Sequence, residues 1–166
     1  MSTPRFALAA LSAGALFALA ACNNDSGEEL TWSAEITSVD QFLHQANSDD
    51  SALYGWNRIV GETEIDGDSV EVEMLGTVDY VDGNGPFRGF ITLTFPGGDT
   101  LALSQDGEAE AEPDTTRADL SADLDVIGGT GRYLDATGDG QWEGFRDEAL
   151  GGEVHMDVTL DVELLE

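Results

Sequence analysis

The chain contains no lysine, a single cysteine and very little positive charge. Six arginines face 34 acidic residues, which gives a formal charge of -28. Nucleic-acid binding is excluded, because contacts to phosphates need a basic surface. One cysteine excludes a disulfide framework and a cysteine-cluster metal site. The lack of lysine excludes Schiff-base and P-loop chemistry.

The remaining composition is that of one ordinary globular domain. The chain has 166 residues, of which 41% are hydrophobic, so it can bury a real core and is not a disordered polymer. The acidic residues are spread along the chain instead of forming a tail. This spread favours a solvated anionic surface, while a surface for cations or a basic partner is the alternative interpretation.

The first residues have the pattern of an export signal. A short basic start with Arg5 precedes an uncharged apolar run, Phe6 to Ala21, which ends in small residues. The run is shorter than the roughly 20 residues that a membrane-spanning helix needs. We therefore predict that residues 1–21 are a cleaved signal peptide.

The end of this signal, Leu19-Ala20-Ala21-Cys22, resembles the lipobox of bacterial lipoproteins. The resemblance implies a lipid anchor on Cys22, the only cysteine, with residues 22–31 as lipidated cysteine and tether. An aspartate after the cysteine favours retention in the inner membrane, and this chain has Asn23 there. The resemblance therefore implies that the protein is anchored in the outer membrane of a Gram-negative cell, facing the periplasm or the exterior. An ordinary secretory signal with a chance cysteine is the alternative.

Residues 32–166 are predicted to be one all-β domain. Apolar and polar residues alternate from Val154 to Leu164, which is the period of a strand with one buried face. Similar sets occupy residues 56–65, 70–80, 87–95, 101–109, 120–126 and 138–150. Glycine-rich turns separate them, including 82–85 and 96–99, so neighbouring strands are expected to be antiparallel.

Seven or eight strands in this order favour an up-and-down sheet that closes into a barrel, with a flat sandwich as the alternative. Gly76 interrupts one alternating set and is interpreted as a bend or bulge. Residues 37–47 lack a strand pattern. We expect a short helix there, with Phe42 and Leu43 capping one end of the barrel.

One glycine-rich segment carries a family resemblance. Residues 126–140 read VIGGTGRYLDATGDG, and residues 89–101 read GFITLTFPGGDTL. Both segments are similar to bacterial proteins with an allene oxide cyclase barrel-like domain, and the first is similar to plant dirigent proteins. The resemblance implies an eight-stranded antiparallel barrel, a hydrophobic interior for a small apolar molecule, no cofactor, and a homo-oligomer, trimeric in plant members. No catalytic residue is carried over, because residues 30–65 lack the glutamate and asparagine of plant cyclases.

Few residues are candidates for chemistry. Tyr80, Arg132, Tyr133 and Trp142 are candidate ligand contacts, although a structural role is the default interpretation for these large side chains. Residues 135–140 imitate the start of a calcium loop, but Arg146 stands where an acid should close it. His44 and His155 have no partner at metal-binding spacing, and no metal site is predicted.

Three functions follow from these observations. The leading hypothesis is a lipid-anchored envelope protein whose barrel binds a small apolar molecule, or which serves as an accessory module, without catalysis. The first alternative is a cofactor-free isomerase or cyclase acting on an apolar substrate, with Tyr80 or Arg132 supplying the polar group. The second alternative is a purely structural envelope protein with a filled barrel.

Overall fold

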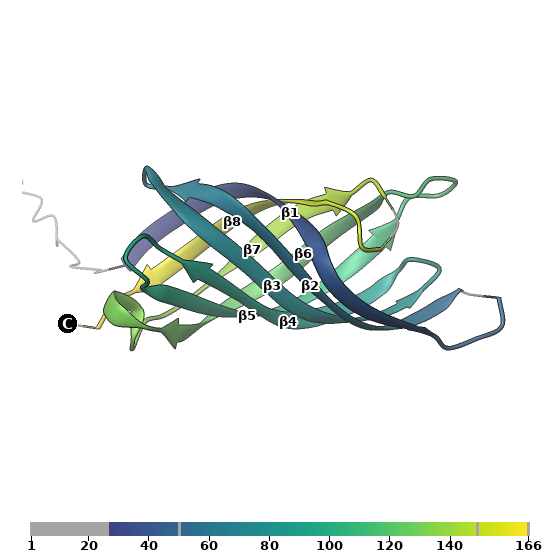
Figure 1. Ribbon diagram of the computed structural model, residues 1–166, viewed down its shortest axis with the longest axis horizontal. Helices are drawn as coiled ribbons and strands as arrows, with labels where there is room; N and C mark the ends of the chain where they lie inside the picture. The colour runs from purple at the N-terminus through teal and green to yellow at the C-terminus, as the bar shows by residue number, and fades with distance from the viewer. Residues whose placement is uncertain (1–26, 50, 149, 166) are drawn as a thin grey trace, which may run out of the picture.

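The computed structural model describes residues 27–49, 51–148 and 150–165, and these form a closed antiparallel β-barrel (Figure 1). The predicted signal peptide and Cys22 lie outside the described residues. Eight strands follow one another around the barrel, and the first pairs with the last. They are β1 (Gly27–Gln45), β2 (Ala52–Ile65), β3 (Asp68–Val81), β4 (Gly85–Thr94), β5 (Thr100–Ala111), β6 (Ala118–Gly129), β7 (Thr137–Arg146) and β8 (Val154–Glu163). The predicted all-β barrel is therefore confirmed, and the sandwich alternative is wrong.

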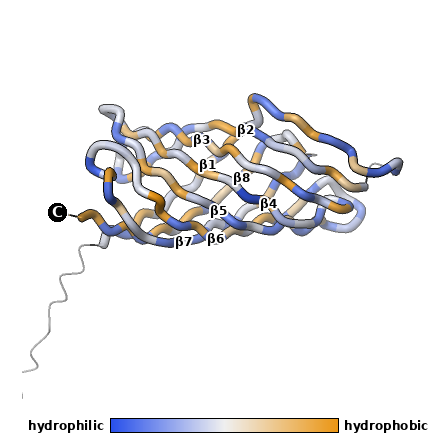
Figure 2. Tube along the Cα trace, turned by 90° about the horizontal axis from the view of Figure 1, so that it is seen from below, coloured by the Kyte–Doolittle hydropathy of each residue, from blue (hydrophilic) through white to orange (hydrophobic). Residues whose placement is uncertain are grey.

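The alternation of apolar and polar residues separates the two faces of the barrel wall. On β8, Val154, Met156, Val158, Leu160 and Val162 are buried, while the polar residues between them face outward. The same alternation runs along the other strands, as the changing colours of the tube in Figure 2 show. The lumen is the hydrophobic core, and the acidic exterior faces water.

The first strand corrects two expectations. It runs from Gly27 to Gln45 without a helix, so Phe42 lies exposed on the outer face, and only Leu43 packs against the core. Its register against β2 shifts between Ser38 and Asp40. A bulge moves the inward phase by one residue, which hides the strand from a period-2 search. Residues 27–31, assigned to the tether from sequence, likewise belong to β1 and pair with β8.

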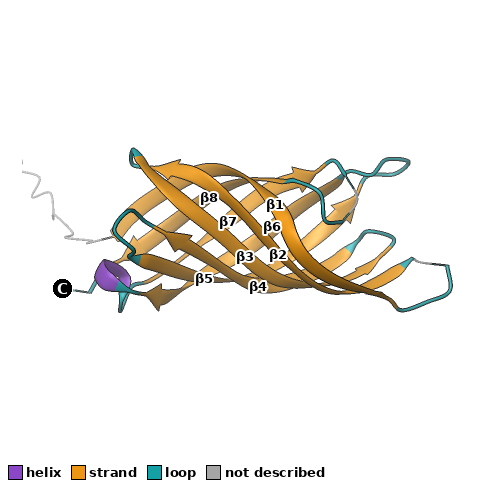
Figure 3. Ribbon diagram, viewed as in Figure 1, coloured by secondary structure: helices purple, strands orange, loops and turns teal. Residues whose placement is uncertain are grey.

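The two ends of the barrel differ in what closes them. One end holds the start of β1, the end of β8 and the short 3-10 helix η1 (Gly131–Tyr133), which is purple in Figure 3. We call it the η1 end. The opposite end holds the β1–β2, β3–β4, β5–β6 and β7–β8 loops (Figure 1). We call it the Arg146 end, after the residue that closes β7.

Gly76 is not a bulge. β3 pairs with β2 and β4 through this position without a shift of register. The glycine stands in the inward phase between Met74 and Val78 and lines the lumen, and a Cβ at this position would lie only 3.0 Å from the carbonyl oxygen of Arg88. Among the described residues, no helix is long and apolar enough to cross a membrane.

Candidate functional site

A small cavity lies in the lumen at the Arg146 end. Its volume is about 50 Å³, and its lining comes from strands all around the barrel and from the β7–β8 loop. One water molecule needs roughly 10–15 Å³ measured in this way, so the space exceeds that of a single water. It is far below the roughly 300 Å³ of a drug-sized pocket. The lumen is therefore mostly filled by its own side chains.

The polar side chains of the core converge on this cavity. Asn57 on β2, Gln105 on β5 and Arg146 on β7 are the buried polar or charged residues of the described chain, and all three line the cavity. Each stands at an inward position of its strand, where the neighbouring inward residues are apolar or glycine. A polar group in an apolar core needs a partner, so their convergence marks a site.

Gln105 and Asn57 each accept a hydrogen bond from another side chain. The indole Nε1–H of Trp142 donates to Oε1 of Gln105 across the lumen at 3.0 Å. Ser38 donates from Oγ to Oδ1 of Asn57 at 2.6 Å. The ring of Phe87 packs against Trp142 with 5.5 Å between centroids, which fixes the indole from its other side. Trp142 thus forms one rigid wall of the cavity.

Arg146 is the least satisfied group of the site. Arg146 is only 6% exposed, and its Nε–H has no hydrogen-bond acceptor among the described residues. Nη1 donates to the carbonyl of Glu148 at 3.3 Å, and the guanidinium carbon lies 5.7 Å from the centre of the Tyr80 ring. Burial lowers the pKa of Arg146, because folding removes water from the charged form. No carboxylate of the described residues lies within ion-pair distance of it.

Tyr80 supplies a neutral hydroxyl to the same cavity. Burial raises the pKa of Tyr80 to about 12, and the nearby charge of Arg146 opposes this only in part. The phenol is protonated at neutral pH, so its hydroxyl has a proton available to donate to a hydrogen-bond acceptor in the cavity.

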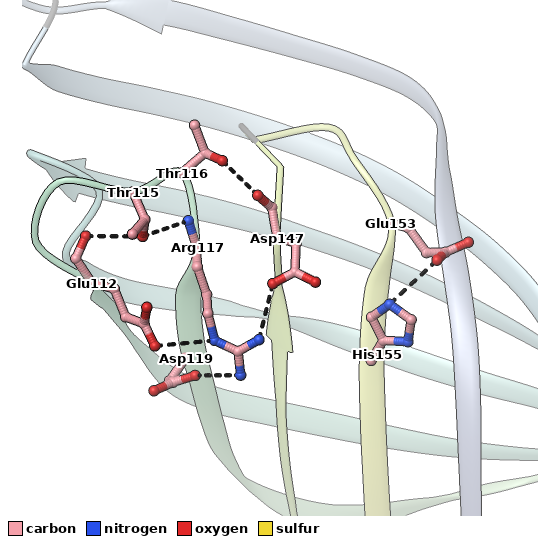
Figure 4. Close-up of polar contacts among 8 residues, drawn as sticks. All are labelled: Glu112, Thr115, Thr116, Arg117, Asp119, Asp147, Glu153 and His155. Carbon is pink, nitrogen blue, oxygen red and sulfur yellow. Dashed lines mark hydrogen bonds and ion pairs between the residues drawn. The ribbon is translucent and has the colours of Figure 1, made fainter.

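The rim of the Arg146 end is held by a second arginine on the outer face (Figure 4). Arg117 contacts three carboxylates, at 3.2 Å to Glu112, 3.1 Å to Asp119 and 2.9 Å to Asp147, and its guanidinium stacks on Phe145. Thr116 adds a hydrogen bond of 2.6 Å to the Asp147 carbonyl. These contacts join the β5–β6 loop to the start of the β7–β8 loop, and that second loop borders the cavity.

The η1 end is sealed. Tyr133 is fully buried and packs on Phe95 at 5.0 Å between ring centres, and its hydroxyl accepts a hydrogen bond from Arg132 Nη2. Gly131, with φ of 58°, passes so close to Asp99 that a Cβ there would collide with the carboxylate. Asp99 in turn accepts the backbone N–H of Arg132 at 3.3 Å. The glycine-rich motif therefore builds a plug.

The four candidate ligand contacts are divided between the two ends. Tyr80 and Trp142 line the cavity, whereas Arg132 and Tyr133 belong to the plug. Sequence reasoning missed Asn57, Gln105 and Arg146. The available signal was a polar residue in the inward phase of an apolar strand, as with Leu101, Leu103 and then Gln105.

One surface cluster could hold a metal ion. Single ligand atoms of Glu35, Glu153 and His155 lie within 4.8 Å of one another, and His155 stacks on Phe145 at 4.6 Å. Both carboxylates lie 3.3 Å from the imidazole, so His155 is flanked by acids and is not simply solvated (Figure 4 draws it with Glu153). The two glutamates are exposed, and their contacts with the imidazole account for the arrangement. The calcium-loop imitation at residues 135–140 runs into the start of β7, and Arg146 lines the lumen cavity instead of closing a loop.

The outer face carries one apolar groove. Trp56 on β2, Leu75 on β3 and Phe90 on β4 are 38%, 46% and 55% exposed and line a groove of about 690 Å³. Phe42 on β1 extends it, because it is paired directly with Trp56. The groove lining contains Arg88 and no carboxylate, on a surface that is otherwise acidic. We call Phe42, Trp56, Leu75 and Phe90 the outer apolar patch.

Comparison with known proteins gives no match, either to a protein-family model or to a curated protein.

Proposed function

We propose that this chain is a lipid-anchored envelope protein whose barrel binds one small molecule in the cavity at the Arg146 end. The observation that carries the proposal is the convergence of Asn57, Gln105 and Arg146 with Tyr80 and Trp142 on one cavity. Buried polar groups cost stability unless they are paired, so a cluster left partly unpaired inside an apolar lumen favours a binding role over a packing role.

The cavity limits the size of the ligand. Apolar walls from Ile59, Met74, Val78 and Phe87 favour a short apolar body. The volume of about 50 Å³ favours a molecule of few heavy atoms, or one whose remainder leaves through the β7–β8 side. A large hydrophobic ligand would require the lumen side chains to move.

Mass spectrometry of the protein from its own host tests the binding proposal. The native mass should exceed the denatured mass by one small ligand, because a covalent lipid on the chain remains in both measurements. Val78→Phe, which fills the cavity, should lose the extra mass. Val70→Ile, on the same strand outside the cavity, is the matched control and should retain it. Equal native and denatured masses for the unmodified protein would contradict binding.

The anchor is a separate part of the proposal. It is supported by the lipobox-like residues Leu19 to Cys22 and by Asn23, which favours the outer membrane of a Gram-negative cell. Cys22→Ser should move the protein from the membrane fraction to the soluble fraction. Continued membrane association of this variant would contradict a lipid anchor.

The family resemblance supports an allene oxide cyclase-like barrel as the parent architecture, and a cofactor-free isomerase is the alternative function. The protonated Tyr80 hydroxyl in the cavity favours that alternative, because a neutral donor can polarise a bound carbonyl or epoxide oxygen. Turnover of a bound compound, lost in Tyr80→Phe while binding persists, would establish catalysis. A lumen that holds no ligand leaves the structural alternative.

For a protein partner, we propose a second copy of this chain, packed on the outer apolar patch. A copy carrying a charge of -28 is repelled by most of the surface, and the patch presents Trp56, Leu75 and Phe90 without a carboxylate. A basic partner would bind the acidic surface instead of the outer apolar patch. Light scattering should show self-association that strengthens with salt and disappears in Phe90→Ser. A monomer at all salt concentrations would assign the patch to another occupant and overturn the proposal.

A further inference from the structure

We infer that the cavity recognises an oxyanion, a carboxylate or phosphate on a short apolar body, and that Arg146 is its counter-charge. This inference rests on the proposed binding function and names the chemical class of the ligand. It adds a charged group to a ligand that the sequence predicted only to be apolar.

The first support is the missing counter-charge. Arg58 pairs with Glu73, Arg88 with Asp106 and Arg117 with three carboxylates. Arg132 has no carboxylate partner among the described residues, but it is exposed to water, whereas Arg146 is buried. Arg146 has none among the described residues, although the chain has 34 acidic residues. A buried cation without a partner is strongly disfavoured, and a planar guanidinium is suited to binding both oxygens of a carboxylate or phosphate. A bound oxyanion would remove this penalty.

The second support is that the free polar groups of the cavity are donors. Because an indole N–H can only donate, Trp142 fixes the amide oxygen of Gln105 toward itself and leaves the Gln105 amide N–H₂ for another acceptor. The Ser38 hydroxyl donates to the amide oxygen of Asn57, so the Asn57 N–H₂ group is not used in that contact. With the Tyr80 hydroxyl and the Arg146 Nε–H, the cavity presents several donors to one small space. A ligand that only accepts hydrogen bonds fits this arrangement.

The third support comes from the sign of the whole molecule. A protein with a charge of -28 repels anions over long distances, so general electrostatic attraction does not bring an anion to its surface. An anion that binds must gain its affinity from local contacts. Anion binding to this protein is therefore a specific signal of the Arg146 site.

The test is a titration that follows the indole N–H resonance of Trp142 by NMR. Butyrate and inorganic phosphate are the anionic probes, and butyramide is the neutral probe matched in shape to butyrate. Butyrate or phosphate should bind at least tenfold more tightly than butyramide. If phosphate binds and butyrate does not, the ligand is of the phosphate type. If butyrate binds and phosphate does not, the ligand is a carboxylate.

Variants separate the site from the rest of the charge. Arg146→Gln should weaken anion binding at least tenfold and leave butyramide unchanged, while Arg146→Lys should restore part of the loss. Arg132→Gln removes the same charge at the η1 end and should leave binding as it was. If the Arg146→Gln protein does not fold, two measurements still test the inference. They are the comparison of the anionic probes with butyramide on the unmodified protein, and the titration of the Arg146→Lys variant, which keeps the charge.

The outcomes distinguish this inference from the function on which it rests. Equal binding of butyrate and butyramide would overturn the oxyanion inference and leave the binding function intact. A neutral ligand retained from the host, without binding of either anion, would do the same. If none of the three probes binds and the native and denatured masses are equal, both the oxyanion inference and the binding function are overturned.

Discussion

Each end of the barrel carries an arginine beside a tyrosine, and the two pairs are built differently. At the η1 end, Arg132 is exposed and donates to the hydroxyl of Tyr133, whose ring fills the lumen. At the Arg146 end, the arginine is buried, its Nε–H has no partner among the residues that the structure describes, and Tyr80 lines the cavity. The Arg132–Tyr133 pair is therefore satisfied by a hydrogen bond within the protein, whereas the Arg146–Tyr80 pair borders the cavity to which we assign the proposed ligand.

The largest effect is expected from emptying the sealed end. Tyr133→Ala should lower the free energy of unfolding by about 3–5 kcal/mol, because it removes a fully buried ring that packs on Phe95. Urea denaturation measures this loss. Tyr133→Phe is the control, since it keeps the ring and loses only the hydrogen bond from Arg132. A loss below about 1 kcal/mol for the alanine variant would show that this end is not tightly packed.

The tyrosines should also make stability depend on high pH. Because burial raises the pKa of Tyr80 to about 12 from 10, the unfolded chain releases this proton at lower pH than the folded chain. The free energy of unfolding should therefore fall as pH rises from 10 to 12, by up to about 3 kcal/mol from Tyr80. Burial also raises the pKa of Tyr133, while the hydrogen bond from Arg132 opposes that rise.

Urea midpoints recorded between pH 9 and 11.5 measure this dependence. Tyr80→Phe should remove the larger share of the slope and Tyr133→Phe the smaller. Identical slopes in the unmodified protein and in Tyr80→Phe would mean that the Tyr80 hydroxyl is not held in the lumen.

Replacing the two arginines by methionine should change stability in opposite directions. Arg146→Met should raise the free energy of unfolding of the empty barrel by about 1–2 kcal/mol, because an apolar chain of similar length replaces a buried charge that has no carboxylate partner among the described residues. Arg132→Met should lower it slightly, since the Tyr133 hydroxyl loses its donor. Thermal unfolding gives both values. Destabilisation by Arg146→Met would indicate a packing role and would weaken the contrast between the ends.

The smallest effect is expected at the rim of the Arg146 end. Arg117→Gln should lower the urea midpoint slightly, because Glu112, Asp119 and Asp147 then repel one another without a cation between them. The loss should shrink in high salt, since these groups are exposed and their interactions are screened. An effect that is independent of salt would mean that stacking on Phe145, not charge, joins the two loops.

The sequence predicted the strands better than the site. Period-2 alternation located the last strand and most others, and it failed at Phe42 because a bulge changes the phase between Ser38 and Asp40. The sequence left both packing and ligand contact open for Tyr133, and the structure places its ring in the core at the η1 end. Arg146 was noticed only as a residue that spoils a calcium loop. Its inward position beside Trp142 and Gly144 was visible in the alternation of β7, but its surroundings were not.

The sequence by itself determined the acidic exterior, the apolar lumen and the antiparallel order of the strands, because side chains alternate across a strand and short turns reverse it. Only the tertiary structure decided that the polar residues Asn57, Gln105 and Arg146 meet. They come from β2, β5 and β7, and their heights in the barrel depend on the register of every strand pair between them. Register is a property of the closed sheet, and it placed the three side chains around one cavity.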